Sequence, residues 1–361
     1  MTAAGYFADA PQDALETLRG PVDAGQVILP PGRDVLFLGA RAGRWAHDLA
    51  RPGWICEQSF LPFADELGRL GLQVRTPDPD ETFSLVMLLP RRQRDERRAM
   101  FGRALRHLAA GGTLLASVAN VEGARSAESD LARLAGPVQQ VSKHKCRAFW
   151  VAPDPAGVDQ NLLEAWLALD APRTIIGGYF SRPGLFAWDH VDPGSALLAE
   201  CLPANLGGRV ADLGAGYGYL GAQVLARCPQ VSALDLYEAE QRALEPARIN
   251  LQHALRVATE QHGRRAVALD VRWHDVTLGL PHRYDAIVSN PPFHQGRADL
   301  PQLGLAFIRS AADALEVDGR LLIVANRHLP YEALLRSRFH EVHALAGRDG
   351  FKVIEAHGVR K

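Results

Sequence analysis

Residues 209–218 read Arg-Val-Ala-Asp-Leu-Gly-Ala-Gly-Tyr-Gly, an apolar run that passes into three glycines. A buried strand that ends in a glycine turn is typical of open α/β sheets, because glycine lets the backbone pass close to a ligand. The helical pattern from Tyr219 to Arg227 completes a strand–turn–helix unit. The stretch therefore predicts a doubly wound domain that binds its ligand beyond the carboxyl end of this strand.

The same plan occurs a second time near the start of the chain. Residues 34–43 read Asp-Val-Leu-Phe-Leu-Gly-Ala-Arg-Ala-Gly, and a helical pattern follows from Trp45 to Ala50. Downstream, each half has an apolar strand ending before a proline turn, a helix, and a glycine turn with a strand ending in Ala-Asn. These are 82–89, 94–108 and 111–120 in the first half, and 284–289, 303–315 and 318–326 in the second. The sequence thus predicts an α/β fold of two tandem doubly wound, Rossmann-like domains of common origin.

The length of the chain agrees with two domains. It has 361 residues, more than one ordinary hydrophobic core accommodates. Pro153, Pro155 and Gly157 cluster between the two repeats, which is typical of a linker. We expect one domain over residues 1–155 and the other over residues 160–361.

Composition excludes several classes of protein. The formal net charge is −1, so a nucleic-acid partner would need a local basic surface rather than a basic chain. The four cysteines are scattered without zinc-ligand or redox spacing, which favours reduced thiols and no metal site. Neither a secretory signal nor an apolar run of membrane length is present, so the cytoplasm is the expected location. The oligomeric state is left open, and a monomer is compatible with the sequence.

Acidic residues follow the strands of the second repeat. Asp212 precedes the glycines, and Asp235 ends the next strand, where a carboxylate can accept hydrogen bonds from both ribose hydroxyls of a nucleoside cofactor. Because a NAD site places an acid similarly, Asp235 does not separate the two classes of cofactor. Asp275 follows the third strand, where it could accept from an adenine amine or could cap a helix.

A proline turn follows the fourth strand of the second repeat and contains the candidate catalytic residues Asn290, Pro291, Pro292 and Phe293. Two prolines make a rigid turn that exposes carbonyl oxygens, next to an amide oxygen that accepts hydrogen bonds. Such a turn suits an exocyclic amine on a planar ring: the Asn290 oxygen and the Pro291 carbonyl hold its two hydrogens, and Phe293 stacks on the ring. A methyl group activated on a sulfonium then needs mainly positioning. A plain strand-terminating turn is the alternative interpretation.

These motifs together resemble those of Class I amino-methyltransferases, and most closely the RsmC and RlmG type of ribosomal RNA guanine-N2 methyltransferases. The resemblance covers nearly the whole chain. The stretches that carry it are Gly178–Arg182, Asp192–Leu198, the glycine turn, Ser289–Gly296, Asn326–Tyr331 and Gly350–Val353, with Ser142–Arg147 in the first half. A short insertion over 183–190 departs from the pattern. Roles of family residues are therefore carried over less securely to positions in that loop.

The resemblance implies S-adenosylmethionine as cofactor and the N2 amine of a guanosine in ribosomal RNA, foremost small-subunit 16S RNA, as substrate. It also implies that the N-terminal domain is degenerate. That domain has Arg41 between its glycines and Leu88-Leu89-Pro90-Arg91-Arg92 in place of the catalytic turn. The predicted cofactor-binding residues are Asp212, Leu213, Gly214, Ala215, Gly216, Asp235, Leu236, Asp275, Val276 and Asn290.

Arginines concentrate in the first domain between residues 91 and 106. A domain without chemistry but with a basic surface could hold RNA phosphates, whereas a solvated helix face is the ordinary alternative. The target base would have to leave its stack to reach Asn290. The candidate RNA-binding residues are Arg91, Arg92, Arg94, Arg97, Arg98, Lys143, Lys145 and Arg147, with ribosomal RNA or a ribosomal subunit as the partner.

Other functions remain open at this point. Adenine-N6 methyltransferases of nucleic acids and glutamine-N5 methyltransferases of proteins use similar turns, often with tyrosine in place of Phe293. A non-catalytic RNA-binding assembly factor is a further alternative, which predicts that no cofactor binds.

Overall fold

The computed structural model describes residues 12–360 except positions 33, 46–52, 264–265, 293, 296–297 and 300. The described residues form two compact units, of which the first ends at Ala171 and the second begins at Pro172. The sequence placed this boundary earlier, between residues 155 and 160. Helix α7 (Gln160–Leu167) belongs to the first unit because its Trp166 is buried in that unit's core. Most of the helix expected over Trp45–Ala50 lies outside the described residues.

The first unit is built on a seven-stranded sheet in the order β3-β2-β1-β4-β5-β7-β6. Neighbours from β3 to β5 pair in parallel, and β7 and β6 add an antiparallel hairpin at one edge. The strands are β1 (Val35–Leu38), β2 (Ile55–Glu57), β3 (Gln73–Val74), β4 (Phe83–Leu88), β5 (Leu108–Ala119), β6 (Gln139–Lys143) and β7 (Cys146–Val151). Besides α7, the helices are α2 (Gln12–Asp23), α4 (Leu61–Arg69), α5 (Arg94–Arg106) and α6 (Ala124–Ala135).

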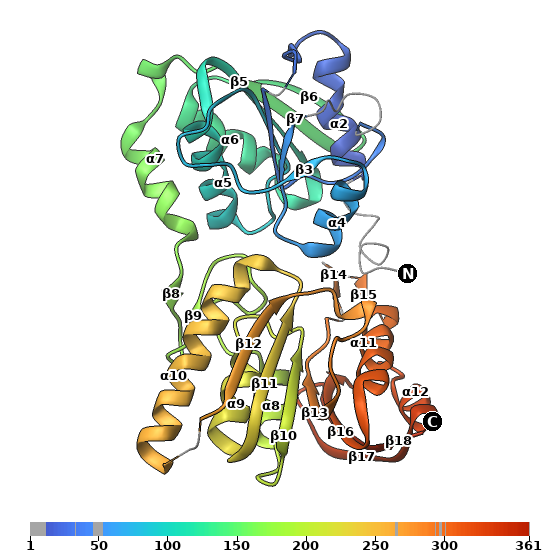
Figure 1. The fold of residues 1–361 in the computed structure, drawn as a ribbon. Helices are drawn as coiled ribbons and strands as arrows, with labels where there is room; N and C mark the ends of the chain where they lie inside the picture. Colours follow the sequence, from blue (N-terminus) through green and yellow to red (C-terminus); the bar gives the residue numbers. More distant parts are fainter. Residues whose placement is uncertain are drawn as a thin grey trace. The chain divides into compact units, whose positions relative to one another are not determined.

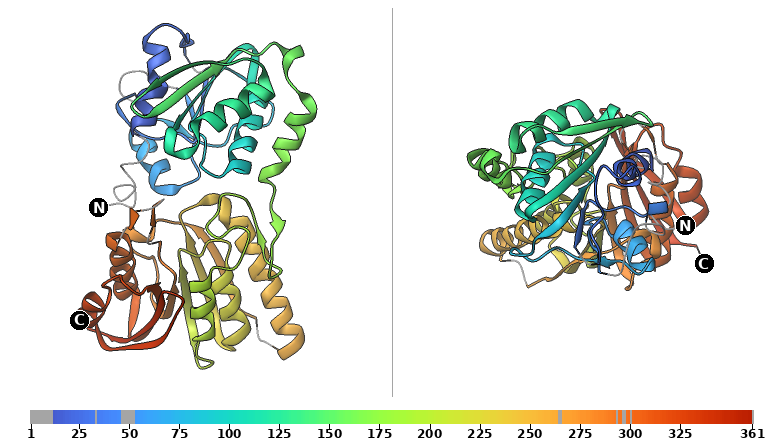
Figure 2. Two further views of the ribbon diagram at one scale, coloured as in Figure 1. Left: turned by 180° about the vertical axis from the view of Figure 1, so that it is seen from behind. Right: turned by 90° about the horizontal axis from the view of Figure 1, so that it is seen from above.

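Both faces of this sheet are buried, as the apolar strands require. Side chains along β1 alternate between the faces. Leu36 and Leu38 pack in the core that contains α5, α6 and α7, which lie together on one side of the sheet (Figure 2). Val35 and Phe37 pack in the core that contains α2 and α4. The unit is therefore doubly wound.

The second unit contains a seven-stranded sheet in the order β12-β11-β10-β13-β16-β18-β17, again with an antiparallel hairpin at one edge. Its strands are β10 (Gly207–Leu213), β11 (Gln230–Glu238), β12 (Ala268–Trp273), β13 (Tyr284–Ser289), β16 (Leu315–Asn326), β17 (Phe339–Arg348) and β18 (Phe351–Val359). Its helices are α8 (Pro193–Glu200), α9 (Tyr219–Arg227), α10 (Leu244–His262), α11 (Pro301–Ala314) and α12 (Glu332–Arg338). The short pairs β8 (Arg173–Thr174) with β9 (Phe180–Ser181) and β14 (His294–Gln295) with β15 (Ala298–Asp299) lie outside this sheet.

The helices of the second unit divide between the two faces of its sheet (Figure 1). Val210 of β10 packs in the core that contains α8, α9 and α10. Its neighbours Ala211 and Leu213 pack in the core that contains α11 and α12. The first strand is therefore covered on both sides, and only its ends are open to a ligand.

The two sheets have the same topology. Numbered along the chain within each unit, the described strands of both sheets read 3-2-1-4-5-7-6, and the seventh strand runs antiparallel to the other six. The predicted fold of two tandem doubly wound α/β domains is thus confirmed. The strand pairing also aligns the two units with each other, residue by residue. The matching pairs are Leu38 with Glu57 and Leu88 in the first unit, and Leu213 with Tyr237 and Ser289 in the second.

Candidate active site

The glycine turn lies at the carboxyl end of β10, which runs between β11 and β13. Gly214 and Gly216 have φ angles of 71° and 53°, the left-handed region in which a side chain is strained. A Cβ at Gly214 would lie 3.2 Å from the Phe307 ring, whereas a Cβ at Gly216 would meet nothing within 4 Å. The turn therefore packs on α11 at one glycine and borders open space at the other, as a backbone that cradles a ligand should.

Asp212 is fully buried at the end of β10. Its Oδ2 accepts a hydrogen bond of 2.9 Å from the backbone N–H of Gly221, in the first turn of α9. Its Oδ1 has no hydrogen-bond partner among the described residues. Burial, opposed by the Gly221 N–H and reinforced by the charge of Glu238, raises the pKa of the Asp212 carboxyl to about 7. A buried carboxylate oxygen without a donor indicates that a polar ligand group completes this site.

Glu238 is the acid that the sequence analysis missed. It is the last residue of β11, so its carboxylate lies beside the glycine turn. Oε2 accepts from the N–H of Gly216 at 2.7 Å, and Oε1 accepts from the N–H of Glu240 at 2.8 Å. Burial raises the pKa of the Glu238 carboxyl, although these two N–H donors favour its charged form. The carboxylate is therefore an acidic acceptor at the strand end, directly beside the turn.

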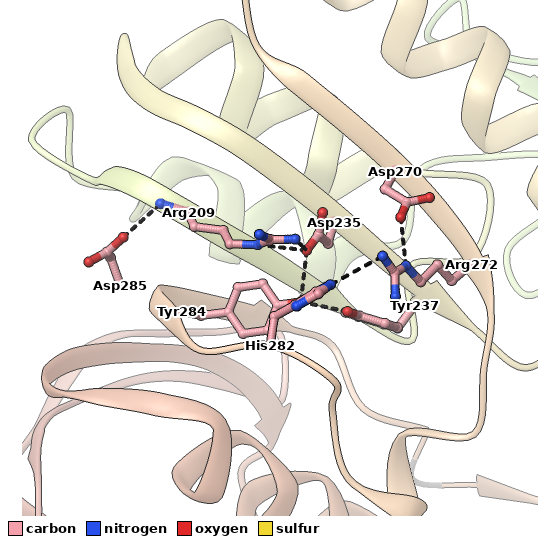
Figure 3. A network of polar contacts seen from close by, with 8 residues as sticks. All are labelled: Arg209, Asp235, Tyr237, Asp270, Arg272, His282, Tyr284 and Asp285. Carbon is pink, nitrogen blue, oxygen red and sulfur yellow. Dashed lines mark hydrogen bonds and ion pairs between the residues drawn. The ribbon is translucent and has the colours of Figure 1, made fainter.

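Asp235, the predicted ribose acid, does not lie at the strand end, and that prediction is wrong. β11 continues for three residues beyond it, and only 2% of Asp235 is exposed. Its Oδ2 accepts from Arg209 at 2.7 and 3.0 Å and from the hydroxyl of Tyr284 at 2.8 Å (Figure 3). Tyr284 in turn contacts the Tyr237 hydroxyl at 2.5 Å. Asp235 is thus part of a polar network that joins β10, β11 and β13 within the sheet.

Three further predicted contacts are apolar side chains inside the cores. Leu236 and Leu213 are fully buried on opposite faces of the sheet, and Val276 is 3% exposed. The Leu236 side chain packs with residues of α9 and α10, so the prediction that it lines the cofactor site is wrong. Ala215 is half-buried in the glycine turn, and its N–H donates to the Tyr237 carbonyl at 3.2 Å.

Asp275 lies just beyond β12, at the same edge of the sheet as the glycine turn. It caps the short helix Val276–Leu278: Oδ1 accepts from the N–H of Thr277 at 2.9 Å and from its hydroxyl at 2.7 Å. The capping role anticipated as an alternative is therefore present. Its contact with an adenine amine stays a prediction.

The Asn290 turn directly follows β13, next to the glycine turn. Ser289 fastens the two strand ends together, since its hydroxyl donates to the Leu213 carbonyl at 2.8 Å. Pro291 is buried and Pro292 is half-buried. Phe293, the predicted stacking residue, lies outside the described residues.

The carboxamide of Asn290 is held by two residues of the loop and helix before β10. Its Nδ2 donates to Oδ2 of Asp192 at 2.9 Å and to Oγ of Ser195 at 2.8 Å. Its Oδ1 is buried and has no hydrogen-bond partner among the described residues. Within the part of the chain that the structure describes, this oxygen is therefore an acceptor without a donor, next to the glycine turn.

The first unit keeps the first glycine of the turn as Gly39, with a φ of 66°, but has lost four of the other features at the matching positions. Phe37 stands where the second unit has Asp212, and it is fully buried. Gln58 replaces Glu238, and both ends of its amide are used within the first unit. The amide nitrogen donates to the Ala40 carbonyl at 2.7 Å, and the amide oxygen accepts from the Phe60 N–H at 2.9 Å. Leu89 replaces Asn290 and is buried.

Arg41 occupies the position of Gly216 in the first unit. Its guanidinium carbon lies 3.2 Å from the centre of the Phe63 ring. Burial is the largest cause that lowers the pKa of Arg41, to about 10. A large side chain thus fills the place where the second unit is open to a ligand.

Most of the predicted RNA-binding arginines are engaged within the first unit. Arg97 is 3% exposed and donates to the Glu122 carbonyl at 3.1 Å, so the prediction that it meets phosphate is wrong. Arg94 and Arg98 both pair with Asp130, at 3.0 and 2.9 Å. Arg147 pairs with Glu128, and Arg91 donates to the Ser59 hydroxyl at 2.9 Å and lies 3.7 Å from the Glu96 carboxylate.

Lys143 and Lys145 differ from these arginines. Both are exposed, and neither forms an ion pair with any residue that the structure describes. They flank His144 in the tight turn between β6 and β7, where His144 and Lys145 have φ angles of 51° and 54°. The Asn120 N–H donates to the Lys145 carbonyl at 2.9 Å, and the Thr17 hydroxyl donates to the Lys143 carbonyl at 3.1 Å. The turn is therefore a fixed basic tip; we call it the 143–145 tip.

The inserted segment 183–190 packs on the glycine turn of its own unit. Leu185 is 6% exposed and shares a small apolar cluster with Tyr217 of the turn and Ala243. The Tyr217 hydroxyl donates to the His190 carbonyl at 3.0 Å. The insertion thus supports the turn from outside rather than forming a separate element.

The described ranges contain neither a cluster of metal-ligand side chains nor a membrane-spanning helix. Three or more His, Cys, Asp or Glu side chains nowhere converge there as metal ligands would. Within those same ranges, every helix is too short or too polar to cross a bilayer.

Comparison with known proteins gives consistent matches. Residues 178–355 match the family model "Methyltransferase small domain". Ribosomal RNA small subunit methyltransferase C of Klebsiella pneumoniae is 32% identical over 79% of this chain and 78% of its own length. The protein of that name from Pseudomonas aeruginosa is 32% identical over 80% and 83%. Among solved structures, the 16S rRNA N2 guanine methyltransferase of T. thermophilus, in complex with AdoMet and guanosine, has a TM-score of 0.72 at 24% identity, covering 97% of this chain and 92% of that one.

Proposed function

The chain belongs to the ribosomal RNA small subunit methyltransferase C family, and from this premise we propose that it methylates the N2 amine of a guanosine in 16S ribosomal RNA. The observation that carries the proposal is the buried Oδ1 of Asn290, which has no hydrogen-bond partner in the described ranges. It is an acceptor without a donor, at the edge of the sheet where ligands bind. An exocyclic amine supplies such a donor.

We propose that the same edge holds S-adenosylmethionine, which supplies a methyl group activated on a sulfonium when bound. Glu238 accepts from the ribose hydroxyls, since its two oxygens lie at the end of β11 beside Gly216. The backbone of the turn at Gly216 faces the open side of the site. Asp212 offers its unpartnered Oδ1 to a polar group of the cofactor. Asp275 accepts from the adenine amine.

The protein's work on the substrate is positioning and charge stabilisation. Asn290 Oδ1 and the Pro291 carbonyl accept the two amine hydrogens, which directs the nitrogen lone pair out of the hydrogen-bonding plane. That nitrogen would become positive as its bond to the methyl group forms and the bond from that methyl group to sulfur breaks. Both carbonyl dipoles would stabilise the charge until one amine proton passes to water. The rigidity of two consecutive prolines keeps the acceptors in place during the step. Stacking of Phe293 on the ring stays a prediction.

We propose that the first unit binds RNA rather than cofactor. Phe37, Arg41, Gln58 and Leu89 replace the four features of the second unit's site. The exposed lysines of the 143–145 tip offer charge to phosphates, and the exposed Arg92 is a further candidate. A strained turn fixed from two sides is a feature that recurs at functional sites.

The proposed reaction is tested with labelled S-adenosylmethionine and small ribosomal subunits that lack this modification. Nucleosides released from the labelled RNA are separated and identified by mass. Label in N2-methylguanosine of 16S RNA is expected, with the Asn290→Ala variant as the inactive control. Label in N6-methyladenosine, or in protein as N5-methylglutamine, would replace the proposal by one of those reactions. No cofactor binding by calorimetry would favour a non-catalytic RNA-binding factor.

A further inference from the structure

The two hydrogen bonds on the Asn290 amide nitrogen come from residues far earlier in the chain. Asp192 Oδ2 and Ser195 Oγ, 98 and 95 residues away, lie 2.9 and 2.8 Å from Nδ2. A carboxamide nitrogen carries two hydrogens, and both therefore point away from the substrate. The oxygen is left as the only part of the amide that can meet a ligand.

This orientation of the amide is the one that chemistry favours. If the carboxamide were rotated by 180°, its oxygen would face the carboxylate of Asp192, which is acceptor-only when ionised. Two acceptors would then be in contact, and the amide N–H groups would point into the site. Asp192 therefore decides which end of Asn290 the substrate meets.

Asp192 is itself held firmly. It is the N-cap of α8, and the same Oδ2 accepts from the N–H of Ser195 at 2.7 Å. Gly194 lets this end of the helix lie against β18, because a Cβ there would fall 2.9 Å from the ring of Phe351. The cap is thus packed against the sheet, and its hydrogen bonds fix the orientation of the Asn290 side chain.

We propose that Asp192 and Ser195 are positioning residues that keep Asn290 as an acceptor only, so that the site selects a substrate group that donates hydrogen bonds. The inference rests on the proposed function and adds a specificity element to it. An exocyclic amine satisfies the oxygen. A ring oxo group at the same place is rejected, because it would leave two acceptors facing each other in a buried site.

Helix capping alone would also explain Asp192, so the variants must separate the two roles. Asp192→Ser keeps a good N-cap residue but has a side chain one bond shorter, which gives up the contact with Asn290. Ser195→Ala removes the Oγ acceptor and keeps the backbone N–H that is capped. Ser310→Ala, at a buried serine of α11 outside the site, is the matched control for the loss of a hydroxyl.

Rates and cofactor affinity are measured for each variant. Ser195→Ala and Asp192→Ser should each lower kcat about tenfold, the rate equivalent of one lost hydrogen bond. Binding of S-adenosylmethionine and the Tm should stay near those of the native protein and of Ser310→Ala. Native kcat in both site variants would overturn the inference while leaving the proposed function intact, because the native protein would still methylate guanosine.

A pH profile gives a second readout that helix capping would not change. In Asn290→Asp, the introduced carboxyl faces Asp192, and the two must share a proton to stay together. Activity of this variant should therefore fall as pH rises between about 5 and 8, whereas the fall should be much weaker in Asp192→Asn/Asn290→Asp. Identical pH profiles for the single and the double variant would contradict a direct role of Asp192.

Discussion

The carboxylate of Glu238 accepts a hydrogen bond of 2.7 Å from the backbone N–H of Gly216. This bond links the end of β11 to the glycine turn after β10, so the acid and the turn form one rigid surface. The match of Glu238 with Gln58 in the first unit shows what its loss does locally. There the amide donates to the Ala40 carbonyl, and the side chain turns inward.

Replacing Glu238 by glutamine should weaken cofactor binding without unfolding the protein. The amide can still accept from one N–H of the turn, but it loses the charge that strengthens the bonds to two hydroxyls. We expect the Kd for S-adenosylmethionine to rise about 10- to 100-fold, the effect of one or two charge-assisted hydrogen bonds. Isothermal calorimetry measures it. An unchanged Kd would mean that another acid holds the ribose.

Asp235→Ala should have the opposite effect, a loss of stability with cofactor affinity retained. The change leaves the Tyr284 hydroxyl buried without its acceptor, and it leaves Arg209 without its partner. Because 38% of the Arg209 side chain is exposed, water compensates part of that loss. We expect the free energy of unfolding in urea to fall by about 1–3 kcal/mol. A Kd that rises as much as in the Glu238 variant would restore the original assignment of Asp235.

The contrast between these two acids shows what the sequence could predict. The strand Tyr284–Ser289 and the helix Tyr219–Arg227 were located correctly, since hydrophobic pattern and glycine position both mark them. The end of β11 was not, because Asp235-Leu236-Tyr237-Glu238 offers two acids three residues apart. Only the pairing of β11 with β10 and β12 shows that the strand continues to Glu238.

Contacts across long stretches of chain were also beyond the sequence. The bonds from Asn290 to Asp192 and Ser195 depend on where α8 packs, and no local pattern reports that. The arginines after residue 91 show the same limit. Their number suggested a basic face, but Asp130 lies on the neighbouring helix α6 and neutralises two of them, and Arg97 is buried.

The raised pKa of Asp212, about 7 against an ordinary 3.8, predicts a pH-dependent stability. Below about pH 4 the carboxyl is neutral in both the folded and the unfolded chain. Between there and about 7 the unfolded chain releases the proton and the folded chain keeps it, so this group lowers the free energy of unfolding as pH rises. Asp212→Asn removes the effect and should gain on the order of 2 kcal/mol over the native protein between pH 4.5 and 7.5. Urea titrations at both values measure it, and a constant difference would contradict the raised pKa.

Gly216→Arg places in the second unit the residue that the first unit has at the matching position. The left-handed φ of 53° costs about 1–2 kcal/mol for a side chain, but no atom lies within 4 Å of the new Cβ, so the fold should persist. We expect calorimetry to give one S-adenosylmethionine per native chain and none for the variant. A second equivalent in the native protein, or binding that remains in the variant, would show that the first unit also holds cofactor.

Charge reversal at the 143–145 tip tests the proposed role of the first unit. Lys143→Glu/Lys145→Glu should raise the KM for RNA and leave cofactor affinity unchanged, because both side chains are exposed and belong to the other unit. If the two lysines meet phosphates, the slope of log Kd for RNA against log salt should fall by about one to two. Arg94→Glu is the comparison variant. It breaks an ion pair with Asp130, so it should lower the Tm and leave the salt slope near that of the native protein. An RNA affinity and a salt slope equal to those of the native protein would remove the tip from the RNA-binding surface.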